Sequence, residues 1–162
     1  SVLIRKVYLF QFFEQLAKQL ERHLVGTKVE LVLAQGDSGT AFFDESKIAR
    51  AVHNLARNAI EAMEPRGGTH TLGCQSDEES ITITVADTGS GVPKAIRHKL
   101  FEPFVTSGKK LGTGLGLSIV KSIVTEHGGD VDVQSSKGGT VFSIVLPQAG
   151  APRSRRPRSM SQ

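Results

Sequence analysis

A glycine-rich stretch, residues 101–120, is the first place in the sequence where residue types and spacing fit a chemical task. Three of its glycines alternate with larger residues, in the order Gly112, Thr113, Gly114, Leu115, Gly116. Such glycines let the backbone bend sharply and approach a ligand closely. An apolar run of helical period follows, and the free N–H groups and dipole at a helix N-terminus favour anions. The stretch therefore predicts a phosphate-binding loop, with a plain surface loop before a packed helix as the alternative.

The loop does not match either of two common nucleotide-binding sequences. A Walker A loop requires G-x-x-x-x-G-K-[ST], but Lys121 and Ser122 follow Val120 instead of a glycine. A dinucleotide fingerprint requires G-x-G-x-x-G directly after a strand, whereas the spacing here is G-x-G-x-G after a polar run.

Asp87 is the second candidate, because it continues the inward-facing side of a strand predicted over 80–86. The apolar residues on that side are Ile81, Ile83 and Val85. A carboxylate that ends such a row is costly unless something bonds to it, and the glycines of DTGSGVP (87–93) supply a turn through which a ligand can reach it. The first three residues of this turn also match the aspartic-protease tripeptide. Those proteases need two copies in a mostly β body, whereas this chain has one copy and long amphipathic helices.

Two asparagines form a third candidate within a helix predicted over 45–63. Asp44 is a good N-cap for this helix, and Pro65 stops it. Asn54 and Asn58 are four residues apart, so they lie on one face. Because asparagine is a mediocre helix former, two in mid-helix suggest a function, and exposed positions with no particular role are the alternative.

The segments that must position these residues predict a protein with both helices and strands. A helix over about 12–24 precedes a strand over 28–34, and 40–43 predicts a short strand that pairs with it as a hairpin. Further strands are predicted over 69–75, 130–133 and 140–146, and the helix after the glycine-rich stretch ends at Gly128 and Gly129. Thr140 shares parity with the apolar residues of its strand, so its hydroxyl lies at the end of one strand face.

Composition favours one soluble domain that works in a reducing compartment. The chain has 162 residues, no apolar run of membrane length and one cysteine, Cys74, which excludes an internal disulfide. Its net charge of +4 belongs to the four arginines of the tail APRSRRPRSMSQ (151–162), because residues 1–150 carry 16 basic and 16 acidic side chains. A solvated, disordered tail is the prediction, and polyanion binding is the alternative.

With these pieces in order, the chain resembles the ATP-binding catalytic (HATPase_c) domain of bacterial sensor histidine kinases, within the GHKL superfamily of gyrase, heat-shock chaperone and mismatch-repair ATPases. Five segments carry the resemblance in the right order: HNLARNAIEAM (53–63), DTGSGVP (87–93), LFEPFVTSG (100–108), GTGLGLSIV (112–120) and GGTVF (138–142). The asparagine segment is most similar to the nitrogen-regulation subclass. The resemblance implies an α+β fold, a two-layer α/β sandwich of the Bergerat type with a mixed sheet and helices on one face.

The resemblance also implies the roles of individual residues around ATP and Mg²⁺. Asn58 would be the magnesium ligand, with Asn54 beside it, and Asp87 would accept a hydrogen bond from the adenine amino group. Thr140 would join the base through water. The turn Gly89, Gly91 and Val92 would lie beside the base. Further implied contacts to the phosphates come from Lys109 or Lys110 and from the lid residues Gly112, Thr113, Gly114, Leu115 and Gly116, while Phe101 and Phe104 would anchor the lid or simply pack in the core.

Two departures from the family pattern bear on function. Many members carry a lysine or arginine three residues after the magnesium asparagine, but Glu61 stands here, and Arg57 is a candidate substitute. The phosphoacceptor histidine segment is absent, so the chain resembles a fragment of a longer kinase with no catalytic residue of its own.

The implied function is that of a protein-histidine kinase domain in a two-component phosphorelay. It would deliver the γ-phosphate to a histidine on the dimerisation domain of the same kinase, with a response regulator downstream. No nucleic acid or membrane contact and a cytoplasmic location are expected. The expected parts are a first helix and linker (1–26), the ATP-binding domain (27–150) and the tail (151–162). An ATPase clamp and an anti-sigma-like serine kinase or binding module are the alternatives, and the clamp is disfavoured because Asn54 stands where those relatives have a glutamate base.

Overall fold

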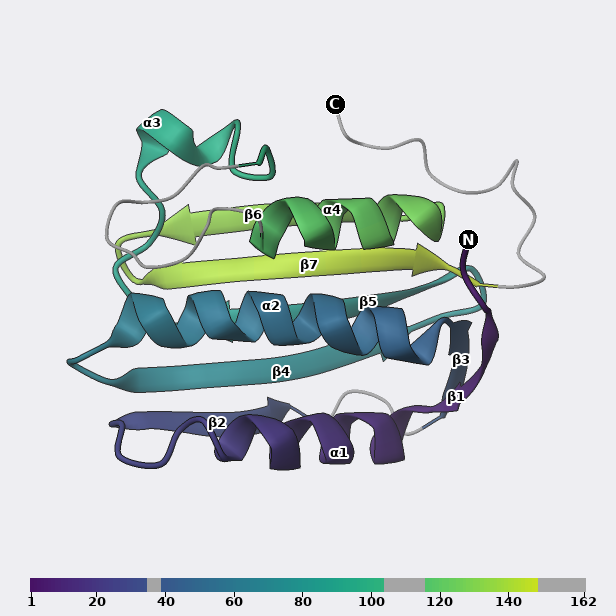
Figure 1. Ribbon diagram of the computed structural model, residues 1–162, viewed down its shortest axis with the longest axis horizontal. Coiled ribbons are helices and arrows are strands. Elements are labelled where there is room, and N and C mark those ends of the chain that lie inside the picture. Colours follow the sequence, from purple (N-terminus) through teal and green to yellow (C-terminus); the bar gives the residue numbers. More distant parts are fainter. Residues whose placement is uncertain (35–38, 104–115, 149–162) are drawn as a thin grey trace.

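The computed structural model describes residues 1–34, 39–103 and 116–148, in which one mixed sheet and a layer of helices pack face to face (Figure 1). The strands, in spatial order, are β2 (Val29–Ala34), β4 (Gly68–Ser76), β5 (Ser80–Asp87), β7 (Gly139–Pro147) and β6 (Asp130–Ser136). The helices on its one covered face are α1 (Leu9–Glu21), α2 (Glu45–Met63) and α4 (Gly116–Glu126). Strand β2 runs parallel to β4, and the other neighbours are antiparallel. The predicted two-layer α/β sandwich of the α+β class is confirmed.

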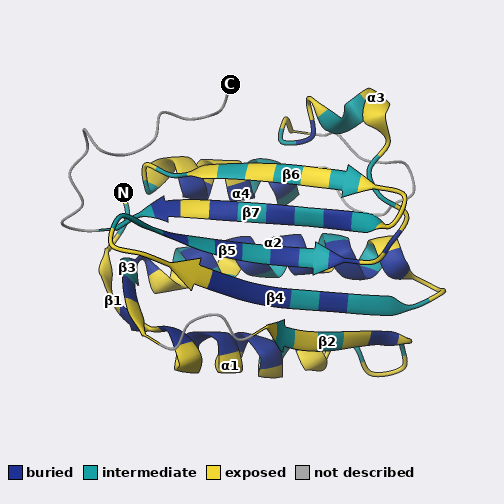
Figure 2. Cartoon of the chain, turned by 180° about the vertical axis from the view of Figure 1, so that it is seen from behind, coloured by how far each residue is buried: buried dark blue, intermediate teal, exposed yellow. Residues whose placement is uncertain are grey.

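The sheet buries one face because its central strands alternate in side-chain type. On β5, Ile81, Ile83 and Val85 are buried and point toward the helices. Figure 2 shows the opposite face of the sheet, which no helix covers. The cross-strand register places Leu72 of β4 and Phe142 of β7 on either side of Val85, so the apolar rows of three strands form one continuous core.

The ends of α2 and α4 are set by local hydrogen bonds. The Asp44 side chain accepts a hydrogen bond from the Lys47 N–H at 3.1 Å, as predicted for the N-cap of α2. Helix α4 ends at Glu126. In the turn that follows, Gly128 has a φ of 73°, which is easy for glycine, and the Gly129 N–H returns to the Val124 carbonyl at 2.9 Å. No helix in the described ranges is long and apolar enough to cross a lipid bilayer.

The predicted hairpin between 28–34 and 40–43 is wrong. Strand β3 (Thr40–Phe43) pairs with β1 (Arg5–Tyr8), which was not predicted, in a separate two-stranded sheet. The side chain of Phe43 is fully buried and packs edge-to-face on Phe12 of α1, with ring centroids 5.2 Å apart. This contact holds β3 at the start of α1, while β2 finds its partner in β4.

Candidate nucleotide-binding site

Most of the predicted site residues that the structure describes lie at one edge of the sandwich. There the C-terminal end of α2, the N-terminal end of α4, the end of β5 and the start of β7 come together (Figure 1). The helix α3 (Lys94–Arg97) stands at the same edge. Six predicted ligand residues lie outside the described ranges, together with Phe104: Lys109, Lys110, Gly112, Thr113, Gly114 and Leu115.

Asp87 ends β5 as a buried carboxylate, with 8% of its surface exposed. Its Oδ1 accepts a hydrogen bond from the Gly89 N–H at 2.8 Å, which closes the turn after the strand. Burial raises the pKa of Asp87, and backbone hydrogen bonds from Gly89 and Thr140 oppose this rise. A carboxylate held in such a place is a strong acceptor for an N–H or O–H group of a ligand.

Thr140 lies directly opposite Asp87 in the β5–β7 register and is 3% exposed. Its Oγ1 is 2.8 Å from the hydroxyl oxygen of Ser135 on β6. The strand end therefore presents a carboxylate and a hydroxyl as neighbours on the helix-facing side, the arrangement that parity predicted for both residues.

The glycines after Asp87 are required by close backbone packing. A Cβ at Gly89 would lie 2.7 Å from the Ala62 carbonyl oxygen at the end of α2. Gly91 has a φ of 88°, and a Cβ there would collide with the carbonyl oxygen of Ser136. The turn is thus pressed between α2 and the β6–β7 hairpin, which gives these glycines a structural reason in addition to the implied place beside a base.

The asparagines lie on α2 where it faces the start of α4. Asn54 and Asn58 are both half-buried, and the Asn54 Nδ2 donates a long hydrogen bond of 3.4 Å to the Gly116 carbonyl. Asn58 lies one turn nearer the Asp87 edge. Because the amide nitrogen of Asn54 is used in this contact between the helices, the asparagines differ in their surroundings although they share a face.

Val92 and Phe101 connect the site to the core. The Val92 carbonyl accepts a hydrogen bond from the Arg97 side chain at 2.8 Å, which fixes the start of α3. The ring of Phe101 packs edge-to-face on Phe142, with centroids 6.1 Å apart. For Phe101, this contact fits the predicted alternative of a packed aromatic.

Sequence reasoning missed His70, Ser135 and Gly139. His70 is fully buried opposite Asp87, and its Nδ1 lies 3.2 Å from the Ala86 carbonyl oxygen. Its Nε2 has no hydrogen-bond partner among the residues that the structure describes. The sequence could have indicated its burial, because His70 alternates in step with Leu72 and Cys74, the inward-facing residues of β4. Gly139 has a φ of 140°, and a Cβ on it would collide with the Asp87 carbonyl oxygen.

The burial of His70 predicts a specific pH dependence of stability. Burial lowers the pKa of His70 below the usual 6.5, so the unfolded chain takes up a proton at a higher pH than the folded chain. The free energy of unfolding should therefore fall as the pH drops below about 6.5, by up to about 1.4 kcal/mol per pH unit from this group. In His70→Leu, urea unfolding at pH 7.5, 6.5 and 5.5 should show a shallower fall.

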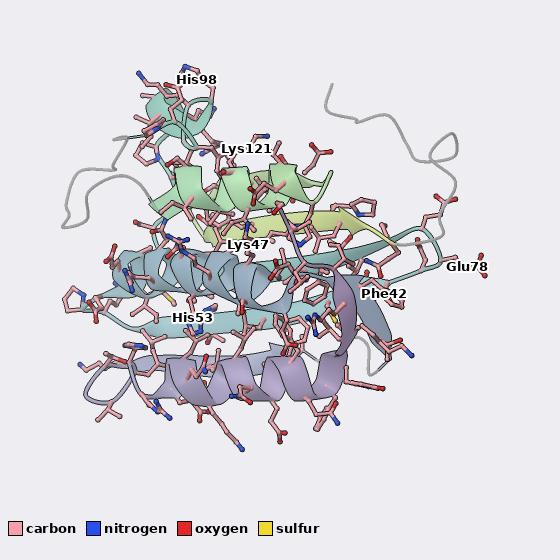
Figure 3. All side chains as sticks on the ribbon, turned by 45° about the vertical axis from the view of Figure 1, so that its right-hand side comes forward. Phe42, Lys47, His53, Glu78, His98 and Lys121 are labelled. Carbon is pink, nitrogen blue, oxygen red and sulfur yellow. The ribbon has the colours of Figure 1, made fainter. Side chains whose placement is uncertain are left out.

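The control is His98→Leu, which removes an exposed histidine that directly follows α3 (Figure 3). Burial also lowers the pKa of His53, so His53 adds to the fall in stability at low pH in the same direction as His70. Both variants keep His53, so its contribution is the same in each. Equal pH slopes for the wild type and His70→Leu would show that His70 does not titrate differently on unfolding.

Comparison with known proteins agrees with this geometry. The model of the histidine kinase-, DNA gyrase B- and HSP90-like ATPase family matches residues 43–150. The C4-dicarboxylate transport sensor protein DctB of Rhizobium meliloti is 38% identical over 114 residues, which are 70% of this chain and 18% of that protein. The sensory histidine kinase/phosphatase NtrB of Klebsiella oxytoca is 37% identical over 114 residues, 64% of this chain and 32% of NtrB. The chain therefore spans less than a third of the length of these curated relatives.

Solved structures show the same fold. The catalytic domain of the histidine kinase ThkA superposes with a TM-score of 0.81 at 25% identity, covering 93% of this chain and 100% of that domain. Full-length ShkA in complex with AMPPNP gives a TM-score of 0.82 at 28% identity, over 94% of this chain and 33% of ShkA. The chain belongs to the family of histidine kinase-, DNA gyrase B- and HSP90-like ATPases.

Proposed function

We propose that the chain binds ATP with Mg²⁺ and delivers the γ-phosphate to a histidine on a separate, dimeric helical domain of the same two-component sensor kinase, and that this catalytic part of the kinase lies in the cytoplasm. The observation that carries the proposal is the pairing of Asp87 with Thr140 at the edge of an ATPase-family domain where α2, the helix that carries Asn58, also ends (Figure 1). The relative NtrB is named as a sensory histidine kinase/phosphatase, which supports the proposed phosphate transfer.

The base would be held by the polar pair at the end of β5 and β7. Asp87 accepts a hydrogen bond from the exocyclic amino group of adenine, and Thr140 contacts the base directly or through water. This assignment is supported by the burial of both side chains, since a buried carboxylate is costly unless it is hydrogen-bonded and can accept more bonds than the one that the Gly89 N–H donates. Gly89 and Gly91 would lie beside the base, where the close packing of their backbone leaves no room for side chains.

The donor set on α2 fits a magnesium ion that arrives with the nucleotide. Mg²⁺ keeps several waters and takes phosphate oxygens together with one or two protein oxygens, and the Asn58 amide supplies such an oxygen without adding negative charge. Bound there, the ion would neutralise charge on the triphosphate. Many family members have a lysine or arginine where this chain has Glu61. Arg57, the exposed residue next to Asn58 on α2, is our candidate for the cationic contact to the phosphates that this lysine or arginine would make.

The chain's own task in catalysis is positioning. A nitrogen of the acceptor imidazole attacks the γ-phosphorus, a new N–P bond forms, and the bond to the β,γ-bridging oxygen breaks as ADP leaves. Residues of this chain hold the base and orient the triphosphate for in-line attack, while the histidine comes from outside the 162 residues. A response regulator is the proposed next acceptor; the ThkA kinase has been solved in complex with the response regulator TrrA.

The structure favours this function over an ATPase clamp. Clamp relatives are expected to carry a glutamate at the position of Asn54, which activates water. Here the Asn54 side chain is a neutral amide whose Nδ2 points to the Gly116 carbonyl. Without a carboxylate there, hydrolysis by water should be slow. A serine-kinase module is distinguished only by which residue receives the phosphate.

The histidines of this chain are poor acceptors. His53 Nε2 lies 2.8 Å from Gln19 Oε1, between α2 and α1 (Figure 3). His70 is buried, and the Nε2 of His127 accepts the Asp44 N–H at 3.0 Å. The family's acceptor histidine is followed by an acidic residue, whereas the five histidines here precede Leu24, Asn54, Thr71, Lys99 and Gly128.

The proposal is tested by following the γ-phosphate. The purified chain is incubated with γ-labelled ATP and magnesium, alone and with the histidine-bearing helical domain of a similar sensor kinase. We expect acid-labile, base-stable label only in the mixture and only on the added domain. Stoichiometric label on any of the five histidines would refute the fragment interpretation, and label on serine would favour the serine-kinase alternative.

A further inference from the structure

Ser135 joins three parts of the site although no sequence motif includes it. Its Oγ accepts a hydrogen bond from the Val92 N–H at 2.7 Å, lies 2.8 Å from Thr140 Oγ1 and lies 3.5 Å from the Gly139 carbonyl oxygen. The register of β6 and β7 pairs Ser135 with Thr140, which in turn pairs with Asp87. The hydroxyl therefore connects the turn after Asp87 to the strand that carries Thr140.

The direction of the hydrogen bonds follows from counting protons. A serine hydroxyl has one proton and two lone pairs, and one lone pair of Ser135 is used by the Val92 N–H. The proton can go to Thr140 Oγ1 at 2.8 Å or to the Gly139 carbonyl at 3.5 Å. Either hydroxyl could donate across the 2.8 Å contact. If Thr140 donated, the Ser135 proton would be left with the 3.5 Å contact to the Gly139 carbonyl, which is long for an O–H···O bond. We therefore assign Ser135 as the donor.

We infer that Ser135 is a positioning residue that orients Thr140 as a hydrogen-bond donor toward the bound base. Because Thr140 accepts from Ser135, its own proton is left for the base or for a bridging water. The end of the sheet then offers one donor, Thr140, beside one acceptor, Asp87. Adenine carries ring-nitrogen acceptors beside an amino donor and matches this pair, whereas hypoxanthine has a carbonyl in place of the amino group. The inference rests on the proposed nucleotide site.

The same hydroxyl holds the turn in place. A Cβ at Gly91 would lie 3.1 Å from Ser135 Oγ, so turn and hairpin are already in contact. The bond to the Val92 N–H fixes this contact at a position just beyond the proposed base site. Loss of the hydroxyl should therefore affect affinity and base preference together.

The test measures ADP and inosine diphosphate binding by calorimetry with the whole chain. We expect the wild type to prefer ADP, Ser135→Ala to bind ADP about 10-fold more weakly, and Ser135→Thr, which keeps a hydroxyl, to stay within about 3-fold of wild type. Thr140→Ala should lose a similar factor. The double variant Ser135→Ala/Thr140→Ala should lose clearly less than the sum of the two single losses, because both changes remove the same donor to the base.

Controls separate this inference from a structural effect and from the proposed function. Ser143→Ala makes the same change on β7, at a position of the opposite parity from Thr140, and should bind ADP like the wild type. If Ser135→Ala does not fold by urea titration, Ser135→Cys, a weaker donor of similar size, should give an intermediate affinity. Additive losses in the double variant, or unchanged ADP affinity in Ser135→Ala or Ser135→Cys, would overturn the inference. Failure of the wild type to bind ADP would instead refute the proposed site.

Discussion

Asp87→Ala is expected to weaken ADP binding by about 5- to 150-fold, which corresponds to 1–3 kcal/mol. The substitution removes the acceptor for the adenine amino group and leaves that donor unpaired in a buried site. Asp87→Asn should lose less, because its amide still offers an oxygen if the side chain turns that way. Titration calorimetry with ADP measures both variants.

Asp87→Asn should also stabilise the domain at neutral pH when no nucleotide is bound. Burial raises the folded-state pKa of Asp87 above 3.8, so the folded chain holds this proton more tightly than the unfolded chain. The stabilising contribution is present below pH 3.8 and is lost as the pH rises through the raised pKa. Above that range the ionised carboxylate disfavours folding, so Asp87→Asn should increase the urea midpoint at pH 7.5 while it weakens ADP binding.

Asp132→Asn provides the matched control, because Asp132 is an exposed carboxylate on the neighbouring strand β6. It should leave ADP affinity unchanged. If Asp87→Ala binds ADP as well as the wild type does, the adenine contact lies elsewhere. If Asp87→Asn is less stable than the wild type at pH 7.5, the carboxylate is a structural group and its burial has another explanation.

Local patterns in the sequence were sufficient to predict the elements that carry the site. The alternation along 80–87 placed Asp87 on the buried face, and the N-cap at Asp44 with the stop at Pro65 gave α2 its bounds. These signals depend on neighbours within a few residues. They translate directly into the direction of a side chain, so the inward position of Asp87 and the shared face of the two asparagines could be predicted without the structure.

Features that depend on distant partners were not predictable in this way. Strand β3 pairs with β1 because Phe43 is buried against α1. The sequence suggests a hairpin with β2 instead, because β2 and β3 are close along the chain. The role of Ser135 depends on Val92, 43 positions away, and on the register of β6 with β7. Serine is common on strands, so its type alone carries no signal.

The first helix shows the same limit at the level of domains. Residues 1–26 were expected to form a linker and first helix ahead of the ATP-binding domain. In the structure Leu9, Phe12 and Leu16 of α1 are buried in the same core as Val52 of α2. The domain boundary at residue 26 stays a prediction. In the structure α1 packs in the same hydrophobic core as α2 and the sheet.

Asn58→Ala is expected to remove most of the magnesium dependence of ATP binding. The amide oxygen of Asn58 on α2 is the proposed protein ligand, while the base contacts at Asp87 lie on strand β5 and should survive. ATP affinity measured in chelator should therefore change little, whereas the tightening on adding magnesium should largely vanish. Phosphate transfer to an added acceptor domain should fall by at least about 100-fold, since the metal supplies several kcal/mol of charge stabilisation.

Two further variants identify the ligand. Asn58→Asp keeps an oxygen at the same place and should retain magnesium-dependent binding, although its added charge lies near the phosphates. Asn54→Ala removes the 3.4 Å hydrogen bond to the Gly116 carbonyl and should lower stability while the magnesium dependence persists. The opposite outcome, with magnesium dependence lost in Asn54→Ala and kept in Asn58→Ala, would move the metal one turn along α2. Both asparagines lie on one face of α2, so that result would move the metal and the triphosphate along this face toward the start of α4. The proposed base contacts of Asp87 and Thr140 would be unchanged.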